Sequence, residues 1–170
     1  LLLAGWDGGA DTFGPFERSV AQHTRTCAYD RFGTGTSDPP ATNQTFSSQA
    51  EDLHALLDAA GEPGPYLVVG HSYGGAEAVT FASRFPEDVN GLLLIDASPA
   101  TWDTASCAVP DDGSDVARSF EASCVAVAEP ANNPEHLDGP AAFAQLARIT
   151  SLGDLPVTVT TAAHHPRPGL

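Results

Sequence analysis

Apolar and polar positions along the chain follow two alternating patterns, one typical of buried strands and one typical of helices. Short runs rich in apolar and β-branched residues predict strands at residues 1–4, 24–29, 66–69, 91–96 and 155–161. Apolar residues at helical spacing predict helices at residues 13–22, 73–85, 116–128 and 139–149, and another that begins at a Ser48–Glu51 capping box and stops at Gly61. Strands that alternate with helices indicate a parallel sheet covered by helices, so the predicted fold class is α/β.

The stretch between residues 99 and 153 differs in character from the rest, being rich in alanine, aspartate and proline. We therefore predict three parts: a core at residues 1–98, an inserted lid at residues 99–153, and a return to the core at residues 154–170. The chain contains no methionine and begins inside a hydrophobic run, so we expect it to be a piece of a longer protein.

The charge balance is strongly acidic, with 7 basic and 22 acidic residues and a net charge of −15. Such a surface repels phosphate backbones and anionic lipids, so we expect no nucleic-acid partner. No apolar run approaches the length of a membrane span. No glycine-rich phosphate motif follows the first strand. We expect a small-molecule substrate, no cofactor and no metal, and the oligomeric state stays open.

The three cysteines are interpreted separately. Cys27 lies in a predicted strand and is expected to be a small buried hydrophobe. Cys107 and Cys124 lack the spacing partners of a zinc site. A disulfide between them would indicate an exported protein and free thiols a cytoplasmic one, and the sequence leaves both open.

Residues 70–75 read Gly-His-Ser-Tyr-Gly-Gly and stand between a predicted strand and a predicted helix. A strand that ends in so tight a turn thrusts its serine out above the sheet, which is the context of a nucleophile elbow. Gly70 and Gly74 flank Ser72 because a Cβ at either position would collide with the neighbouring strand and helix. We therefore predict Ser72 as a nucleophile.

Two further segments resemble the α/β-hydrolase superfamily, in particular its serine hydrolases of the esterase and haloperoxidase-like type. Residues 4–6, Ala-Gly-Trp, match the family's His-Gly-x turn, and residues 30–38 are similar to its Asp-x-Arg-Gly-x-Gly-x-Ser loop. The resemblance implies an α/β-hydrolase fold, a mostly parallel sheet with helices on both faces, here incomplete at both ends and with a small helical lid. It also implies that the N–H groups of Trp6 and Tyr73 form the oxyanion hole. This chain departs from the family's pattern at Ala4, where the family has a histidine that organises the turn.

The acid of the catalytic triad is predicted at Asp96. Many family members carry the acid after the strand that corresponds to residues 155–161, but residues 161–170 contain no Asp or Glu. Asp96 follows the preceding strand, a position similar to that of the acid in haloalkane dehalogenases. Parallel strands end on one edge of the sheet, so Asp96 and Ser72 are expected to share that edge. The alternative is that Asp96 only ends the strand and caps the next turn. Asp154 is excluded as the triad acid because it precedes its strand and so lies at the wrong edge of the sheet.

The base is expected beyond residue 170, because the family's chain order is Ser, acid, His, with one more strand before the His. His71 is next to Ser72 in sequence but is expected to point away from its hydroxyl. His164 and His165 follow a strand and a turn and are the weaker candidates within the chain. The remaining histidines are not candidates: His23, His54 and His136.

These residues predict a serine hydrolase that cleaves an ester or similar acyl bond of a small uncharged substrate through an acyl-enzyme on Ser72. Cofactor-free perhydrolysis uses the same constellation and stays an alternative. A non-catalytic, ligand-binding member of the fold is the alternative from another class, and the intact elbow argues against it. Without its base, the 170-residue chain alone is not expected to be active.

Overall fold

The computed structural model describes residues 1–101 and 114–161. The helices and strands are, in chain order, β1 (Leu2–Leu3), the 3-10 helix η1 (Ala10–Phe13), α1 (Gly14–Val20), α2 (Phe46–Ala60), β2 (Tyr66–His71), α3 (Tyr73–Arg84), the 3-10 helix η2 (Pro86–Asp88), β3 (Val89–Ile95), α4 (Asp115–Ala128), the 3-10 helix η3 (Pro130–Asn132), α5 (Gly139–Leu146) and β4 (Val157–Thr160).

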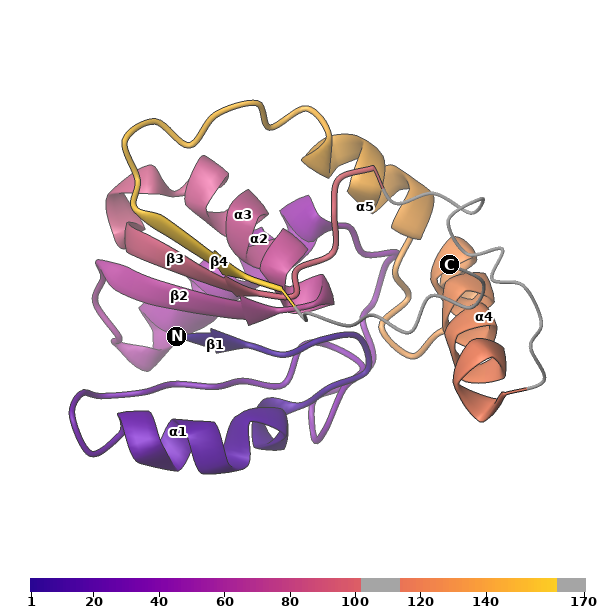
Figure 1. Cartoon of the computed structure of the whole chain (residues 1–170), viewed down its shortest axis with the longest axis horizontal. Helices are drawn as coiled ribbons and strands as arrows, with labels where there is room; N and C mark the ends of the chain where they lie inside the picture. Colours follow the sequence, from indigo (N-terminus) through magenta and orange to yellow (C-terminus); the bar gives the residue numbers. More distant parts are fainter. Residues whose placement is uncertain (102–113, 162–170) are drawn as a thin grey trace.

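In the described part of the chain, the four strands form one parallel sheet in the order β1-β2-β3-β4, with β1 and β4 as its outer strands (Figure 1). In the register, His71 of β2 pairs with Ile95 of β3, and Ile95 pairs with Thr160 of β4. All three strands therefore end at the same level. This confirms the predicted α/β class with a parallel sheet.

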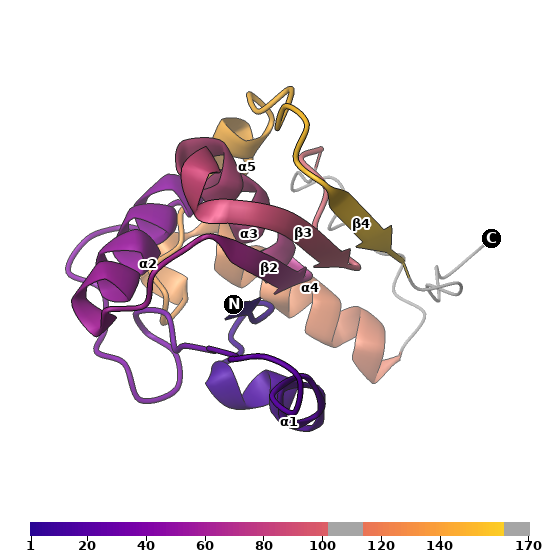
Figure 2. The same cartoon turned by 90° about the vertical axis from the view of Figure 1, so that its left-hand side faces the viewer.

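The two faces of the sheet are covered by different helices (Figure 2). Val68 of β2 packs in one core cluster with Leu53 of α2 and Phe81 of α3. The next residue, Val69, belongs to a second cluster with Phe13 of η1 on the other face. Successive strand residues point to opposite faces, so one apolar run supplies both cores.

One predicted strand is wrong. Residues 24–29 form a single parallel bridge, between Ala28 and Leu2, and not a strand. Since β1 consists of two residues, it offers few backbone partners for a longer ladder. Cys27 in this segment is half-buried and carries a free thiol, where a fully buried side chain was expected.

The start of α2 also differs from the prediction. The helix begins at Phe46, and its capping box is formed by Thr45 and Ser48 instead of Ser48 and Glu51. The Thr45 N–H donates to Ser48 Oγ at 2.8 Å, and the Ser48 N–H donates to Thr45 Oγ1. The buried Phe46 side chain draws the first turn into the core. The predicted end is confirmed, since Gly61 closes the helix with a left-handed φ of 67°.

Helices α4 and α5 lie toward the carboxyl ends of the strands (Figure 1). A Cβ on Gly139 would lie 2.4 Å from Val127 Cγ1, so the start of α5 is pressed against the end of α4. Phe143 of α5 packs with Phe46 of α2 and Tyr73 of α3. The division into residues 1–98, 99–153 and 154–170 stays a prediction. Cys107 lies outside the described residues, as do His164 and His165.

Candidate active site

Ser72 lies in the turn between β2 and α3 and has a strained backbone, with φ of 50° and ψ of −118°. A non-glycine residue in this region is held there only when its surroundings over-determine the conformation. Here the Ser72 N–H donates to Ile95 O at 3.0 Å, and the Ser72 carbonyl accepts from the N–H groups of Gly75 and Ser98, each at 3.0 Å. The end of β3, the loop after it and the first turn of α3 therefore hold the turn, and the Ser72 side chain is half-buried.

Three glycines allow the backbone segments around Ser72 to approach one another. A Cβ on Gly70 would lie 2.4 Å from Gly74 O, and one on Gly75 would lie 2.4 Å from Ala97 Cβ. A Cβ on Gly74 would lie 2.3 Å from Leu3 O, which is backbone of β1. The first turn of α3 is thus in direct contact with the residues that lead into the turn at Trp6.

The predicted oxyanion donors lie on the two sides of this contact. A Cβ on Gly5 would lie 3.5 Å from Ser72 Cβ, so the turn at Trp6 is adjacent to the serine. Tyr73 is the first residue of α3, and its N–H has no acceptor within the helix. Within residues 1–101 and 114–161, neither the Trp6 nor the Tyr73 N–H donates a hydrogen bond. The two aromatic rings meet edge to face, 5.7 Å between centroids.

Asp96 immediately follows β3, as Ser72 immediately follows β2. Because His71 pairs with Ile95, the two residues occupy matching positions at the carboxyl edge of the sheet. The Asp96 backbone has a positive φ of 49°, and its N–H donates to Thr160 O at 2.7 Å. Asp154 precedes β4 and so lies at the opposite end of that strand. The role of Asp96 as the acid stays a prediction.

None of the four histidines in the described part of the chain forms a hydrogen bond with Ser72. The ring of His71 faces Gly5, since a Cβ there would lie 3.1 Å from His71 Nδ1. His54 stacks on Phe85 with 4.1 Å between ring centroids and lies 3.2 Å from Asp88 Oδ2. The remaining two are distant in the chain from the elbow: His23 in the turn after α1 and His136 before α5.

A buried ionic network lies beneath the site, and the sequence did not reveal it. The network consists of Arg31, Glu77 and Glu135, whose side chains are between 0% and 3% exposed. Arg31 Nε donates to Glu135 Oε2 at 2.7 Å, and Arg31 Nη1 lies 3.4 Å from Glu77 Oε2. The one signal in the sequence is Glu77 itself, which is the one carboxylate in α3.

Burial and charge act against each other in this network. Burial raises the pKa of Glu77, while Arg31 and the Tyr29 hydroxyl, which donates to Glu77, oppose the rise. Burial lowers the pKa of Arg31, but the carboxylates of Glu77 and Glu135 outweigh this and raise it above its ordinary value. Burial also raises the pKa of Tyr29 and of Tyr73. Arg31 therefore remains a cation under all conditions in which the protein is folded.

A cavity of about 150 Å³ opens beside the network, between the loop after residue 29 and α2. It is lined by Tyr29, Asp30, Arg31, Phe32, Ser37, Gln44, Gln49, Asp52 and Leu56. Neither Ser72 nor Asp96 contributes to this lining, so the cavity does not bring a ligand to the serine. Among residues 1–101 and 114–161, no cluster of histidine, cysteine or carboxylate side chains is arranged to hold a metal ion. No helix in those ranges is long and apolar enough to cross a bilayer.

Comparison with known proteins agrees with this geometry. A family model described as the alpha/beta hydrolase fold matches residues 1–120. The uncharacterized protein YqjL of Bacillus subtilis is 34% identical over 106 residues, which cover 62% of this chain and 41% of that protein. Lipase 1 of Psychrobacter immobilis is 33% identical over 99 residues, which cover 58% of this chain and 31% of the lipase.

A solved hydrolase structure from Pseudomonas aeruginosa superposes over most of the chain. It covers 98% of this chain and 72% of its own, with a TM-score of 0.68 and 22% identity, which shows a shared fold. The chain spans less than half the length of the two sequence relatives. The strand-to-helix elbow, the parallel sheet and the family match lead to one conclusion: the chain belongs to the alpha/beta hydrolase fold family.

Proposed function

We propose that this protein is a serine hydrolase that cleaves an ester or similar acyl bond through an acyl-enzyme on Ser72. The observation that carries the proposal is the strained Ser72 backbone, held beside two backbone N–H groups that donate no hydrogen bond within the described residues. Strain of this kind is concentrated at functional sites. The lipase among the relatives supports an acyl substrate.

In the proposed reaction, Ser72 Oγ attacks the acyl carbon while a base takes its proton. The negative charge that develops on the substrate oxygen is stabilised by the N–H groups of Trp6 and Tyr73. Removing one such donor typically costs about 10²–10³-fold in rate. Asp96 orients the base, which we place outside the described residues. When the tetrahedral intermediate collapses, the bond between the acyl carbon and the leaving group breaks, and the base gives its proton to that leaving group. Water, which loses a proton to the same base, then attacks the acyl-enzyme, and the acid is released as Ser72 Oγ regains its proton.

We further propose that the substrate is a small, uncharged molecule. The elbow adjoins an apolar core cluster in which Trp6 packs with Tyr73, Phe46 and Phe143. Apolar surroundings of this kind favour a substrate whose acyl group is apolar. The strongly acidic surface, with a net charge of −15, disfavours anionic substrates.

The test is covalent labelling of the complete protein with a fluorophosphonate, followed by mass spectrometry of the modified peptide. We expect labelling at Ser72, loss of labelling in Ser72→Ala, and unchanged labelling in Ser83→Ala, whose serine lies exposed on α3. Ester hydrolysis should fall by about 10⁴-fold or more in Ser72→Ala. A wild-type protein that is not labelled, or a Ser72→Ala variant that keeps its activity, would exclude the proposal.

A further inference from the structure

The turn that carries Trp6 is held by two buried side chains that lie far from it in sequence. Arg31 Nη1 donates to Ala4 O and Arg31 Nη2 donates to Gly5 O, both at 2.8 Å. The Asp7 N–H donates to Glu135 Oε1 at 3.1 Å. The backbone groups on both sides of Trp6 are therefore fixed, and the Trp6 N–H between them is left without an acceptor in the described residues.

We propose that Arg31 and Glu135 are positioning residues that aim the Trp6 N–H at the oxyanion. This inference rests on the proposed function, since it assigns a task in the same site. The turn contains Gly5, Gly8 and Gly9, and glycine gives a backbone many alternative conformations. External partners are needed to select one of them, and the guanidinium supplies several donors in a rigid plane.

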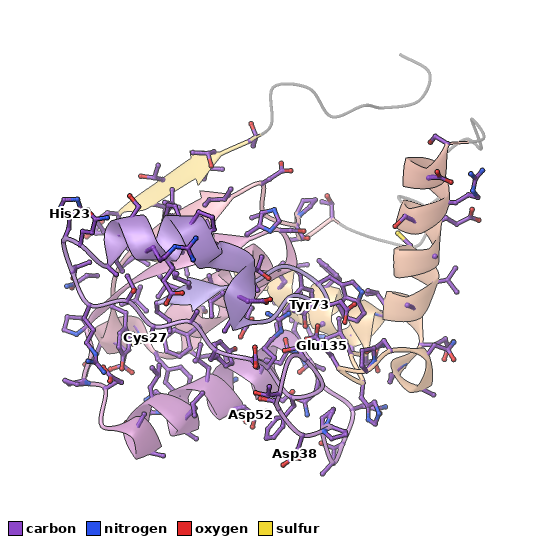
Figure 3. The ribbon with its side chains drawn as sticks, turned by 90° about the horizontal axis from the view of Figure 1, so that it is seen from below. His23, Cys27, Asp38, Asp52, Tyr73 and Glu135 are labelled. Carbon is purple, nitrogen blue, oxygen red and sulfur yellow. The ribbon has the colours of Figure 1, made fainter. Side chains whose placement is uncertain are left out.

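The same guanidinium also contacts the side chain of Tyr73, the residue whose backbone N–H is the second proposed donor. The Arg31 Cζ atom lies 4.9 Å from the centre of the Tyr73 ring, over its face. The Tyr73 hydroxyl donates to Gln49 Oε1, and Gln49 Nε2 lies 3.4 Å from Glu135 Oε2. Figure 3 shows Glu135 and Tyr73 close together. The network thus touches the residues on both sides of the proposed oxyanion hole.

Glu135 is presented by a rigid turn just before α5. The Asn133 side chain donates to the carbonyls of Ala126, Glu129 and Leu137 at 2.9–3.1 Å, and it accepts from the Leu137 N–H at 2.7 Å. A Cβ on Gly33 would lie 2.0 Å from Pro134 O, so the turn is docked tightly against the loop that carries Arg31. A displacement of residues 133–138 would therefore be transmitted to the turn at Trp6.

A purely stabilising role makes a different prediction. Buried ion pairs are frequently no better for stability than apolar residues of similar volume, so stability alone does not require this network. A stabilising role predicts that substitutions lower the unfolding temperature and leave the kinetics of the folded fraction unchanged. A positioning role predicts a lower kcat with an unchanged KM, because the oxyanion exists only in the transition state.

The test measures hydrolysis of p-nitrophenyl butyrate by the complete protein at a temperature where each variant is folded by circular dichroism. We expect Arg31→Lys and Glu135→Ala to lower kcat about 10- to 100-fold with KM within about twofold, since misplacing a reacting group by 1 Å costs about 10²-fold. Glu135→Gln keeps an acceptor for the Asp7 N–H and should recover part of the loss. Arg84→Met, which removes an exposed pair with Glu51, is the matched control and should leave kcat unchanged.

The outcomes separate this inference from the proposed function. If the wild-type protein is neither labelled at Ser72 nor active, the proposed function fails. If the wild type is active and folded Arg31→Lys and Glu135→Gln both keep the wild-type kcat, the positioning role is wrong. If Arg31→Lys or Glu135→Ala does not fold, the Glu135→Gln variant alone decides, because it preserves the shape of the side chain. A kcat of Glu135→Gln that is lowered about threefold or more would then support the positioning role, and an unchanged kcat would overturn it.

Discussion

The elbow around Ser72 and the network around Arg31 lie against each other, yet they are built in opposite ways. The elbow is made of consecutive residues, 70–75, and its glycines approach backbone atoms and the methyl group of Ala97. The network joins residues 31, 77 and 135, and its contacts are between charged side chains and carbonyl groups. Sterics therefore shape one half of the site, and electrostatics the other.

The difference teaches how each half should respond to substitution. A turn in which three imagined Cβ atoms fall within 2.4 Å of other atoms has no room for one added methyl group. A network of hydrogen bonds tolerates isosteric replacement and suffers mainly when a charge loses its partner. Three substitutions test this contrast, in order of decreasing expected effect.

Gly74→Ala should have the largest effect. The new methyl group would meet Leu3 O and Ala4 O at 2.3–2.4 Å, and both are backbone atoms of the sheet and the adjoining turn. We expect a loss of about 3 kcal/mol or more in the free energy of unfolding, measured by urea denaturation, together with loss of fluorophosphonate labelling. Gly14→Ala is the control, since its methyl group would meet only Arg18 Nη1 at 3.6 Å. Equal stability of the two variants would contradict the steric account of the elbow.

Gly33→Ala should disturb the network indirectly, by displacing the 133–138 turn that carries Glu135. Its φ of 81° strains any residue with a side chain, and its methyl group would meet Pro134 O at 2.0 Å. We expect about 2 kcal/mol of destabilisation and a faster hydrogen exchange of the Leu137 amide, because the turn that presents Glu135 is pushed away. Fluorophosphonate labelling should slow but persist, since the elbow itself is untouched. Labelling at the wild-type rate would indicate that the 133–138 turn has no influence on the site.

Glu77→Gln should change the pH dependence of stability more than the stability itself. Burial raises the folded-state pKa of Glu77 above its ordinary value of 4.5, so the native protein binds this proton more tightly than the unfolded chain does. The resulting stabilisation is present below the ordinary pKa and is lost as pH rises through the folded-state pKa. Gln cannot titrate, so the free energy of unfolding of the variant should fall less over this interval. The free energy of unfolding of both proteins is measured by urea denaturation across this pH interval. If it falls equally with pH in the wild type and in Glu77→Gln, the raised folded-state pKa of Glu77 is refuted.

The fold was largely predictable from the sequence because its signals are local. The apolar runs at β2 and β3 predict buried strands, and Gly61 marks the end of α2. The errors occur where local signals compete. Thr45 and Ser48 both suit an N-cap, and packing of Phe46 decided between them. Residues 24–29 have strand character, but only one of them finds a partner on β1.

In the candidate site too, some residues could be predicted from local signals and others could not. Ser72, Tyr73, Asp96 and Trp6 could be named from motifs and strand ends, and the register of β2 and β3 brings Ser72 and Asp96 to one edge. Arg31 was visible only as part of a loop, and neither Glu77 nor Glu135 belongs to a motif. Their pairing across 46 and 104 residues depends on how the loop, α3 and the 133–138 turn pack together.

The sequence by itself determined the parallel sheet, the elbow and the order of its parts, because continuous apolar runs and glycines at fixed positions act within a few residues. Tertiary structure alone decided which charges are buried together and which backbone turn they hold. A carboxylate such as Glu135 is an ordinary surface residue until the fold removes water from it. Once water is removed, its free energy depends on partners from distant parts of the chain, which no local pattern records.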